Sequence, residues 1–345
     1  MSGKNKKSRY WNKVAGIIFL MLLILVSATL VSGYSWFNRK LDQVSAALSD
    51  ELFIVPAGAS IQQVAELLEA SGLIESALLF RLHMRLEYRD ASIKAGEFKF
   101  MPPVTIRTTA AQLVEGRVYY HRITVPEGLD WQETASVLAG QGFGSTGEYL
   151  GLINVPDLIR DLDPAAENLE GYLFPETYFV TSGTTPAEII GLMVDRFRKN
   201  WTEEFRRQAV SLEMSTREVL TLASLIEKES SSPEERRLVS SVFHNRLRKG
   251  MKLACDPTVI YAVKLAKPWD GIINRSDLQL DSPYNTYLYP GLPPGPIANP
   301  GLDSIKAALF PEQTEFFFFV SKNDGSHIFS EKYSDHAEAV RKYQR

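Results

Sequence analysis

The longest apolar run in the chain lies near its N-terminus. Residues 14–33 are apolar except for Ser27, Thr29, Ser32 and two glycines. Twenty helical residues rise about 30 Å, which is the hydrocarbon thickness of a bilayer. The pattern therefore predicts one transmembrane helix at 14–33, with aromatic residues at both of its ends.

Positive charge is concentrated before this run. Residues 1–13 hold five Lys or Arg residues, whereas only Arg39 and Lys40 follow the run closely. The positive-inside rule makes residues 1–13 a cytoplasmic tail and places the rest of the chain outside. The alternative is a cleaved signal peptide, but the run is long for one and lacks a small-x-small cleavage site. We expect a single-pass protein of the cell (inner) membrane with a periplasmic body.

A strand, a turn and a helix occur twice after the linker expected at 34–50. Residues 53–74 and 123–144 each have an apolar strand, a Val-Pro-x-Gly turn and an amphipathic helix. Ser60 and Asp130 are the predicted helix caps. The first copy, with a helix at 77–86, a strand at 94–101 and a helix at 105–115, predicts a small α+β domain at 51–120. This signature resembles LysM-like modules of cell-wall proteins, and a generic β-turn-α unit is the alternative.

Helical periodicity dominates the larger domain expected at 121–345. The predicted helices are 146–153, 185–200, 202–212, 215–230 and 233–249, the last with acids in its first turn. Phe316 to Val320 and Ser326 to Ser330 predict a hairpin with a buried first strand, and a helix follows from about Ser334. Loops rich in Gly, Pro and aromatic residues are expected at 170–178, 256–261 and 284–301.

The helix at 215–230 carries an acid where a core residue is expected. At about 100° per residue, Leu222 and Ile226 lie on one apolar face, and Glu229 falls inside that face. Glu227 falls at its margin, and Lys228 points away. Burial disfavours a charged carboxylate, so the pKa of Glu229 is expected to rise, as a general acid requires. The alternative is that Glu229 reaches solvent or is neutralised by a basic side chain.

The composition argues against several classes of function. The net charge of −3 gives no indication of a nucleic-acid partner, and the single cysteine, Cys255, excludes an intramolecular disulfide and a cysteine-rich metal site. His244, His327 and His336 show no metal-ligand spacing, and there is no Gly-rich phosphate loop. We therefore expect no cofactor and no metal.

Several ordered motifs carry a resemblance to a known family. They read LASLIEKES, VFHNRLRKGMKL, DPTVIYA, SPYNTY, GLPPGPIANPG, SIKAALFP and FFFFVSKNDGSHIF, between Leu222 and Phe329. With the single anchor, they resemble the endolytic murein transglycosylases of the MltG type, also called the YceG-like family. The fold expected is α+β: a transmembrane helix, a small LysM-like domain, and a larger, mainly helical catalytic domain with a β-hairpin and long Pro/Gly-rich loops.

The resemblance implies a lyase that cuts peptidoglycan glycan strands between N-acetylmuramic acid and N-acetylglucosamine, leaving 1,6-anhydro ends. It implies that Glu229 is the catalytic acid and that strand elongation near the membrane is limited, with peptidoglycan synthases as partners. Two rivals stay open: a hydrolase that pairs Glu229 with Glu170, Glu176 or Asp256, and a non-catalytic wall-binding protein. The residues expected to line the glycan groove or orient Glu229 are Ser230, Glu170, Glu176, Tyr261, Asn285 and Tyr287.

Overall fold

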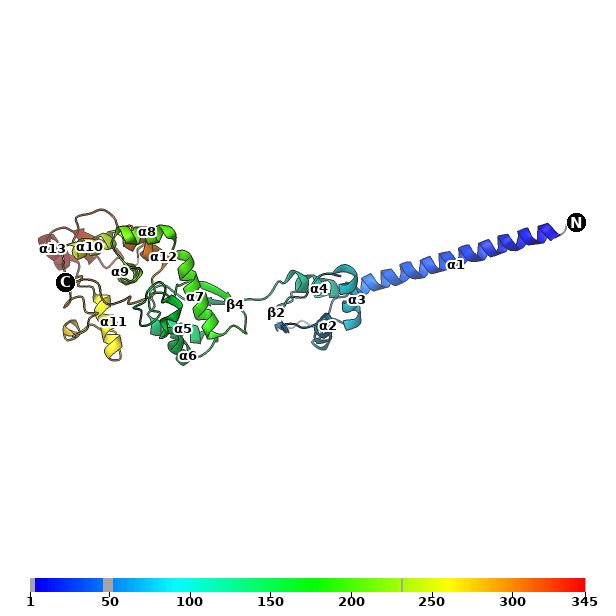
Figure 1. The fold of residues 1–345 in the computed structure, drawn as a ribbon, viewed down its shortest axis with the longest axis horizontal. Helices are drawn as coiled ribbons and strands as arrows, with labels where there is room; N and C mark the ends of the chain where they lie inside the picture. Colours follow the sequence, from blue (N-terminus) through cyan, green and yellow to red (C-terminus); the bar gives the residue numbers. More distant parts are fainter. Residues whose placement is uncertain (1–3, 46–51, 231, 345) are drawn as a thin grey trace. The chain divides into compact units, whose positions relative to one another are not determined.

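The chain folds into two compact units, residues 1–120 and 121–345, in a computed structural model (Figure 1). The structure describes residues 4–45, 52–230 and 232–344. Within these ranges it holds thirteen α-helices and three two-stranded antiparallel sheets, so the fold is mixed α and β. Each unit has its own hydrophobic core.

The first helix, α1 (Lys4–Leu41), is longer than the apolar run that predicts it. Within its segment Tyr10–Leu41, the most apolar 18-residue window has a mean hydropathy of 2.9, and the segment is long and apolar enough to cross a membrane. The helix continues into the linker expected at 34–50 because Phe37 and Leu41 pack on the core of the first unit, where Leu41 is 1% exposed. Residues 1–3 of the expected tail and 46–50 of the expected linker lie outside the described residues.

The rest of the first unit has the order β-α-α-β-α. Strand β1 (Phe53–Val55) precedes α2 (Ile61–Ala70) and α3 (Ala77–Glu87) and pairs antiparallel with β2 (Gly96–Phe98). Helix α4 (Ile106–Glu115) follows and ends at Gly116, which adopts the left-handed conformation that glycine accommodates at helix ends. The Ser60 side chain caps α2 as predicted, by accepting from the Gln63 N–H.

The second unit begins with the same β-α-α-β order. Strand β3 (His121–Thr124) precedes α5 (Trp131–Gly140), α6 (Thr146–Ile153) and a 3-10 helix, η1 (Pro156–Ile159), and pairs antiparallel with β4 (Thr177–Val180). Asp130 caps α5 through the Gln132 and Glu133 N–H groups. The predicted strand-turn-helix repeat is therefore present in both units, and the similarity extends to the second helix and the return strand.

The part of the chain that follows is helical, and four of its helices pack against α9. In order, the helices are α7 (Pro186–Asn200), α8 (Glu203–Ser211), α9 (Thr216–Glu229), α10 (Arg236–Arg248), α11 (Asp256–Ala266), the 3-10 helix η2 (Asp277–Gln279) and α12 (Leu302–Leu309). Helix α9 packs against α8, α10, α11 and α12, which buries every residue from Val219 to Ile226 (Figure 1).

Two expectations for these helices are wrong. Residues 256–261 are not a loop but the start of α11, because Pro257 lies in the first turn, where its missing N–H costs no helix bond. Helix α10 starts at Arg236, so Glu234 and Glu235 precede it instead of forming its first turn.

The chain ends with a hairpin and a helix: β5 (Phe318–Ser321), β6 (His327–Ser330) and α13 (Tyr333–Tyr343). The hairpin is as predicted, but its first strand is not fully buried, since only Val320 is. The strand is partly exposed because β5 forms one wall of an open cleft.

Candidate active site

Glu229 is the last residue of α9 and lines a cleft of about 740 Å³ in the second unit. The apolar face of α9 holds the helix in the core, with Leu222 and Ile226 fully buried. The same face therefore carries Glu229 out of the core and into the wall of the cleft, where its side chain is partly exposed. Other lining residues are Arg246, Lys252, Ala254, Asp256, Tyr287, Phe318, Phe319, His327, Tyr333 and His336.

The surroundings of Glu229 favour its protonated form. Burial raises the pKa of its carboxyl above the ordinary value, and the negative charge of Asp256 raises it further. A hydrogen bond from the Cys255 thiol and the charges of His327 and Arg246 act in the opposite direction, but burial is the largest effect. Among the described residues, no Lys or Arg forms an ion pair with Glu229.

Glu227, two residues earlier, has the opposite environment. Its side chain is 7% exposed and pairs with Arg236 at 3.4 Å. Its second oxygen accepts the Gly301 N–H at 2.9 Å, which ties the end of α9 to the start of α12. Glu227 is thus neutralised by an arginine, whereas Glu229 is left to titrate within the cleft.

The segment before α11 holds Cys255, whose thiol donates to Glu229. Ala254 has φ of +47°, an unfavourable conformation for a residue with a Cβ, and its N–H donates to the Thr286 carbonyl at 3.1 Å. The next N–H, of Cys255, donates to the Thr286 hydroxyl at 3.0 Å. Backbone strain of this kind gathers at functional sites, and the thiol of the next residue, Cys255, donates to Glu229.

Tyr287 belongs to the same cleft. Its hydroxyl donates to Asp256 at 2.6 Å, and burial with the Asp256 charge raises the pKa of this hydroxyl. Two residues away, Asn285 is fully buried, and its amide donates to the carbonyls of Leu278 and Leu280. Tyr287 therefore faces the cleft, whereas Asn285 shapes the loop that presents it.

Comparison with known proteins agrees with these features. The YceG-like family matches residues 53–342. A protein of Bacillus subtilis (strain 168) named endolytic murein transglycosylase is 33% identical over 306 residues, which are 84% of this chain and 83% of that protein.

The chain belongs to the YceG-like family. A protein with the same name from Streptococcus pneumoniae (strain D39) is 29% identical over 94% of this chain, which spans 64% of that longer protein. The crystal structure of a YceG-like protein from Listeria monocytogenes superposes with a TM-score of 0.58 at 30% identity, covering 84% of this chain and 98% of that one.

In this YceG-like chain, Glu170 and Tyr261 meet outside the cleft. Glu170 is 3% exposed, and one of its oxygens accepts from the Trp131 N–H at 3.0 Å and the Tyr261 hydroxyl at 3.2 Å. Burial raises the pKa of Glu170 to about 8. The residue lines a separate pocket of about 240 Å³ that includes Tyr284 and Arg217.

Two further predicted residues also point elsewhere. Glu176 forms an ion pair with Arg196 at 2.8 Å, and it is not among the residues of the cleft. Ser230 is buried, and its hydroxyl donates to the Ser232 carbonyl at 2.9 Å instead of contacting the Glu229 carboxyl. Of the predicted set, the structure therefore brings Glu229 and Tyr287 together in one cleft.

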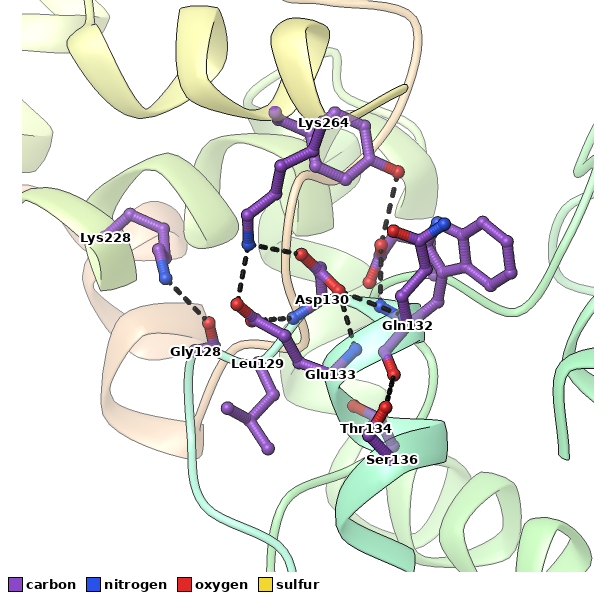
Figure 2. A network of polar contacts seen from close by, with 12 residues as sticks. Gly128, Leu129, Asp130, Gln132, Glu133, Thr134, Ser136, Lys228 and Lys264 are labelled. Atoms are coloured by element: carbon purple, nitrogen blue, oxygen red, sulfur yellow. Dashed lines mark hydrogen bonds and ion pairs between the residues drawn. The ribbon is translucent and has the colours of Figure 1, made fainter. Parts of the chain in front are cut away.

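A polar network fixes α11 and α9 to the start of α5 (Figure 2). The Lys264 ammonium donates to Asp130 at 2.8 Å and Glu133 at 2.6 Å, and the Lys228 ammonium donates to the Gly128 carbonyl at 2.9 Å. Since Asp256 begins α11 and Glu229 ends α9, this network holds the two helices that carry the acids of the cleft.

Sequence reasoning missed His327 and Arg246 as cleft residues. The one signal for them was their presence in the motifs SKNDGSHIF and VFHNRLRKGMKL. In the part of the chain that the structure describes, no cluster of three or more His, Cys, Asp and Glu side chains is arranged to hold a metal.

Proposed function

We propose that this protein is an endolytic murein transglycosylase, a lyase that cleaves the glycosidic bond between N-acetylmuramic acid and N-acetylglucosamine in nascent glycan strands. The observation that carries the proposal is the Glu229 carboxyl, desolvated, without an arginine partner, and open to a cleft large enough for sugar residues. Relatives in Bacillus subtilis and Streptococcus pneumoniae that bear this name support it.

Protonated Glu229 donates its proton to the glycosidic oxygen, and the C6 hydroxyl of the muramic acid attacks C1 to close a 1,6-anhydro ring. In the one-carboxylate mechanism that the family resemblance implies, the same carboxylate then removes the hydroxyl proton. No water is consumed. The substrate's N-acetyl group stabilises the positive charge that develops at C1.

A two-carboxylate hydrolase is the rival enzyme, since most glycosidases use two acids. Of its three candidate partners for Glu229, only Asp256 lines the cleft, whereas Glu170 occupies another pocket and Glu176 is paired with Arg196. A hydrolase leaves reducing ends, whereas the lyase leaves anhydro ends, so the products separate the two.

Helix α1 supports a membrane anchor with the basic residues 4–13 in the cytoplasm and the catalytic unit on the outer face. An active site tethered there meets strands as synthases release them, so cleavage limits their elongation. The β1-α2-α3-β2 order of the first unit supports a LysM-like module that contacts or spaces the glycan.

The test is product analysis by mass spectrometry on uncrosslinked glycan strands. The wild type is expected to release fragments with 1,6-anhydro ends, and Glu229→Gln is expected to release none while unfolding at the wild-type temperature. A wall-binding protein without activity would bind the strands and release nothing. Cleavage retained by Glu229→Gln would remove this residue from the proposal.

A further inference from the structure

An exposed aromatic ring lies on the wall of the cleft that Glu229 lines. Tyr333, the first residue of α13, is 69% exposed, more than any other aromatic side chain described between residues 121 and 344. It lines the cleft together with Phe318, Phe319 and His336. Single exposed aromatic residues are common on protein surfaces, but an exposed ring grouped with other rings in a cleft marks a binding surface.

Neighbouring rings hold the Tyr333 side chain in place. The Phe318 ring meets it edge-on with the ring centroids 5.7 Å apart, and the centroid of the His336 ring lies 6.1 Å away. Phe318 is itself stacked on His336 at 5.2 Å, and the Arg246 guanidinium lies 5.4 Å from the centroid of the Phe318 ring. The Tyr333 ring is therefore supported by the hairpin and by its own helix, while most of its surface faces solvent.

The fold makes little use of the Tyr333 side chain. Within the described part of the second unit, its hydroxyl forms no hydrogen bond, whereas the Tyr287 hydroxyl in the same cleft donates to Asp256 at 2.6 Å. Helix α13 packs against β5 and β6, and its buried residue is Ala339. Replacing Tyr333 is therefore expected to leave the helix in place.

The lining of the cleft matches the two kinds of surface on a sugar ring. Its apolar lining residues include Phe318, Phe319, Val320, Tyr333 and Val340, and its charged ones include Glu229, Arg246, Lys252 and Asp256. A sugar ring presents C–H groups on its faces and hydroxyl groups at its rim. The face of an aromatic ring carries partial negative charge, which attracts the partly positive C–H groups. The polar side chains of the same cleft are then available to the hydroxyl groups.

We infer that Tyr333 is the aromatic platform on which the cleft holds one sugar ring of the glycan strand, so that α13 is part of the substrate site. This inference rests on the proposed function and deepens it. The proton transfers stay with Glu229, and the platform contributes to binding alone. An interaction of this kind stabilises the bound substrate and the transition state alike, so its loss raises KM more than it lowers kcat.

The test compares variants of the full-length protein in detergent on uncrosslinked glycan strands. Aromatic contacts contribute about 3- to 10-fold to an affinity, so Tyr333→Ala is expected to raise KM by about that factor with kcat little changed. Tyr333→Phe keeps the ring and is expected to keep the wild-type KM. Tyr333→Leu keeps apolar bulk without an aromatic face and is expected to raise KM as the alanine variant does. Phe179→Ala is the matched control, because Phe179 is 64% exposed on β4 and does not line the cleft.

Binding without cleavage separates this inference from the proposed function. In the Glu229→Gln background, which is expected to leave strands uncut, adding Tyr333→Ala is expected to raise the Kd for labelled strands, measured by fluorescence anisotropy, by the same factor as KM. A wild-type KM and Kd in the alanine variant, or equal values for Tyr333→Leu and Tyr333→Phe, would overturn the inference. If the wild type forms no 1,6-anhydro ends, the proposed function fails instead, and the Kd comparison still tests the platform.

Discussion

Replacing Glu170 by glutamine is expected to stabilise the fold at neutral and alkaline pH. The Glu170 carboxyl is 3% exposed, and burial raises its pKa to about 8 from an ordinary value of 4.5. One of its oxygens accepts two hydrogen bonds, and the other is buried without a partner. An amide has the same shape as the protonated acid and accepts the same two bonds, but it cannot ionise.

The direction of the pH effect follows from the pKa of Glu170, which is higher in the folded protein than in the unfolded chain. Between pH 4.5 and about 8 the folded protein keeps a proton on Glu170 that the unfolded chain releases, so stability falls as pH rises through this window. At about 1.4 kcal/mol per pH unit, the loss approaches about 3 kcal/mol at pH 7 and about 5 kcal/mol at pH 8. Below pH 4.5 the Glu170 carboxyl is protonated in both the folded and the unfolded state, so it does not lower the stability of the wild type.

The assay is urea unfolding of the wild type and Glu170→Gln at pH 4.5, 6, 7 and 8, followed by tryptophan fluorescence. Trp131 lies next to the site, because its backbone N–H donates to Glu170. The two proteins are expected to be about equally stable at pH 4.5 and to diverge progressively, with the variant more stable at pH 8. A difference that stays constant with pH would show that Glu170 reaches water or a cation in the fold.

Two further predictions concern the end of α9. In the proposed mechanism protonated Glu229 is the active acid, so activity is lost as pH rises through the pKa of Glu229. Cys255→Ala removes a hydrogen bond that lowers this pKa and is expected to move the loss of activity to higher pH. Asp256→Asn removes a charge that raises the pKa of Glu229, so it is expected to move the loss of activity to lower pH. If both variants shifted the pH profile of kcat/KM in the same direction, the assignment would be contradicted. Arg236→Met leaves Glu227 buried without its cation, so the free energy of unfolding is expected to fall by about 3 kcal/mol; an unchanged urea midpoint would show that Glu227 is satisfied by other groups.

Features set by local periodicity could be predicted from the sequence. The apolar face of α9 identified Glu229 as the acid inside the core face, because helical spacing depends only on neighbours in the chain. The caps Ser60 and Asp130 and the hairpin turn before His327 are local in the same sense.

Partners that are distant in the sequence could not be predicted. Glu170 meets Tyr261 across 91 positions, and Glu235 meets His327 across 92. No period of helix or strand relates such positions, since tertiary packing alone brings them together. The half-exposed strand β5 was missed for the same reason, because apolar residues predict burial and not the wall of a cleft.

The most direct measurement is cleavage of uncrosslinked glycan strands in ¹⁸O-labelled water. Attack by the C6 hydroxyl forms the new bond within the sugar, so the released ends are expected to be 1,6-anhydro sugars without ¹⁸O. Reducing ends that carry ¹⁸O would show that water attacks C1, and this protein would then be a hydrolase.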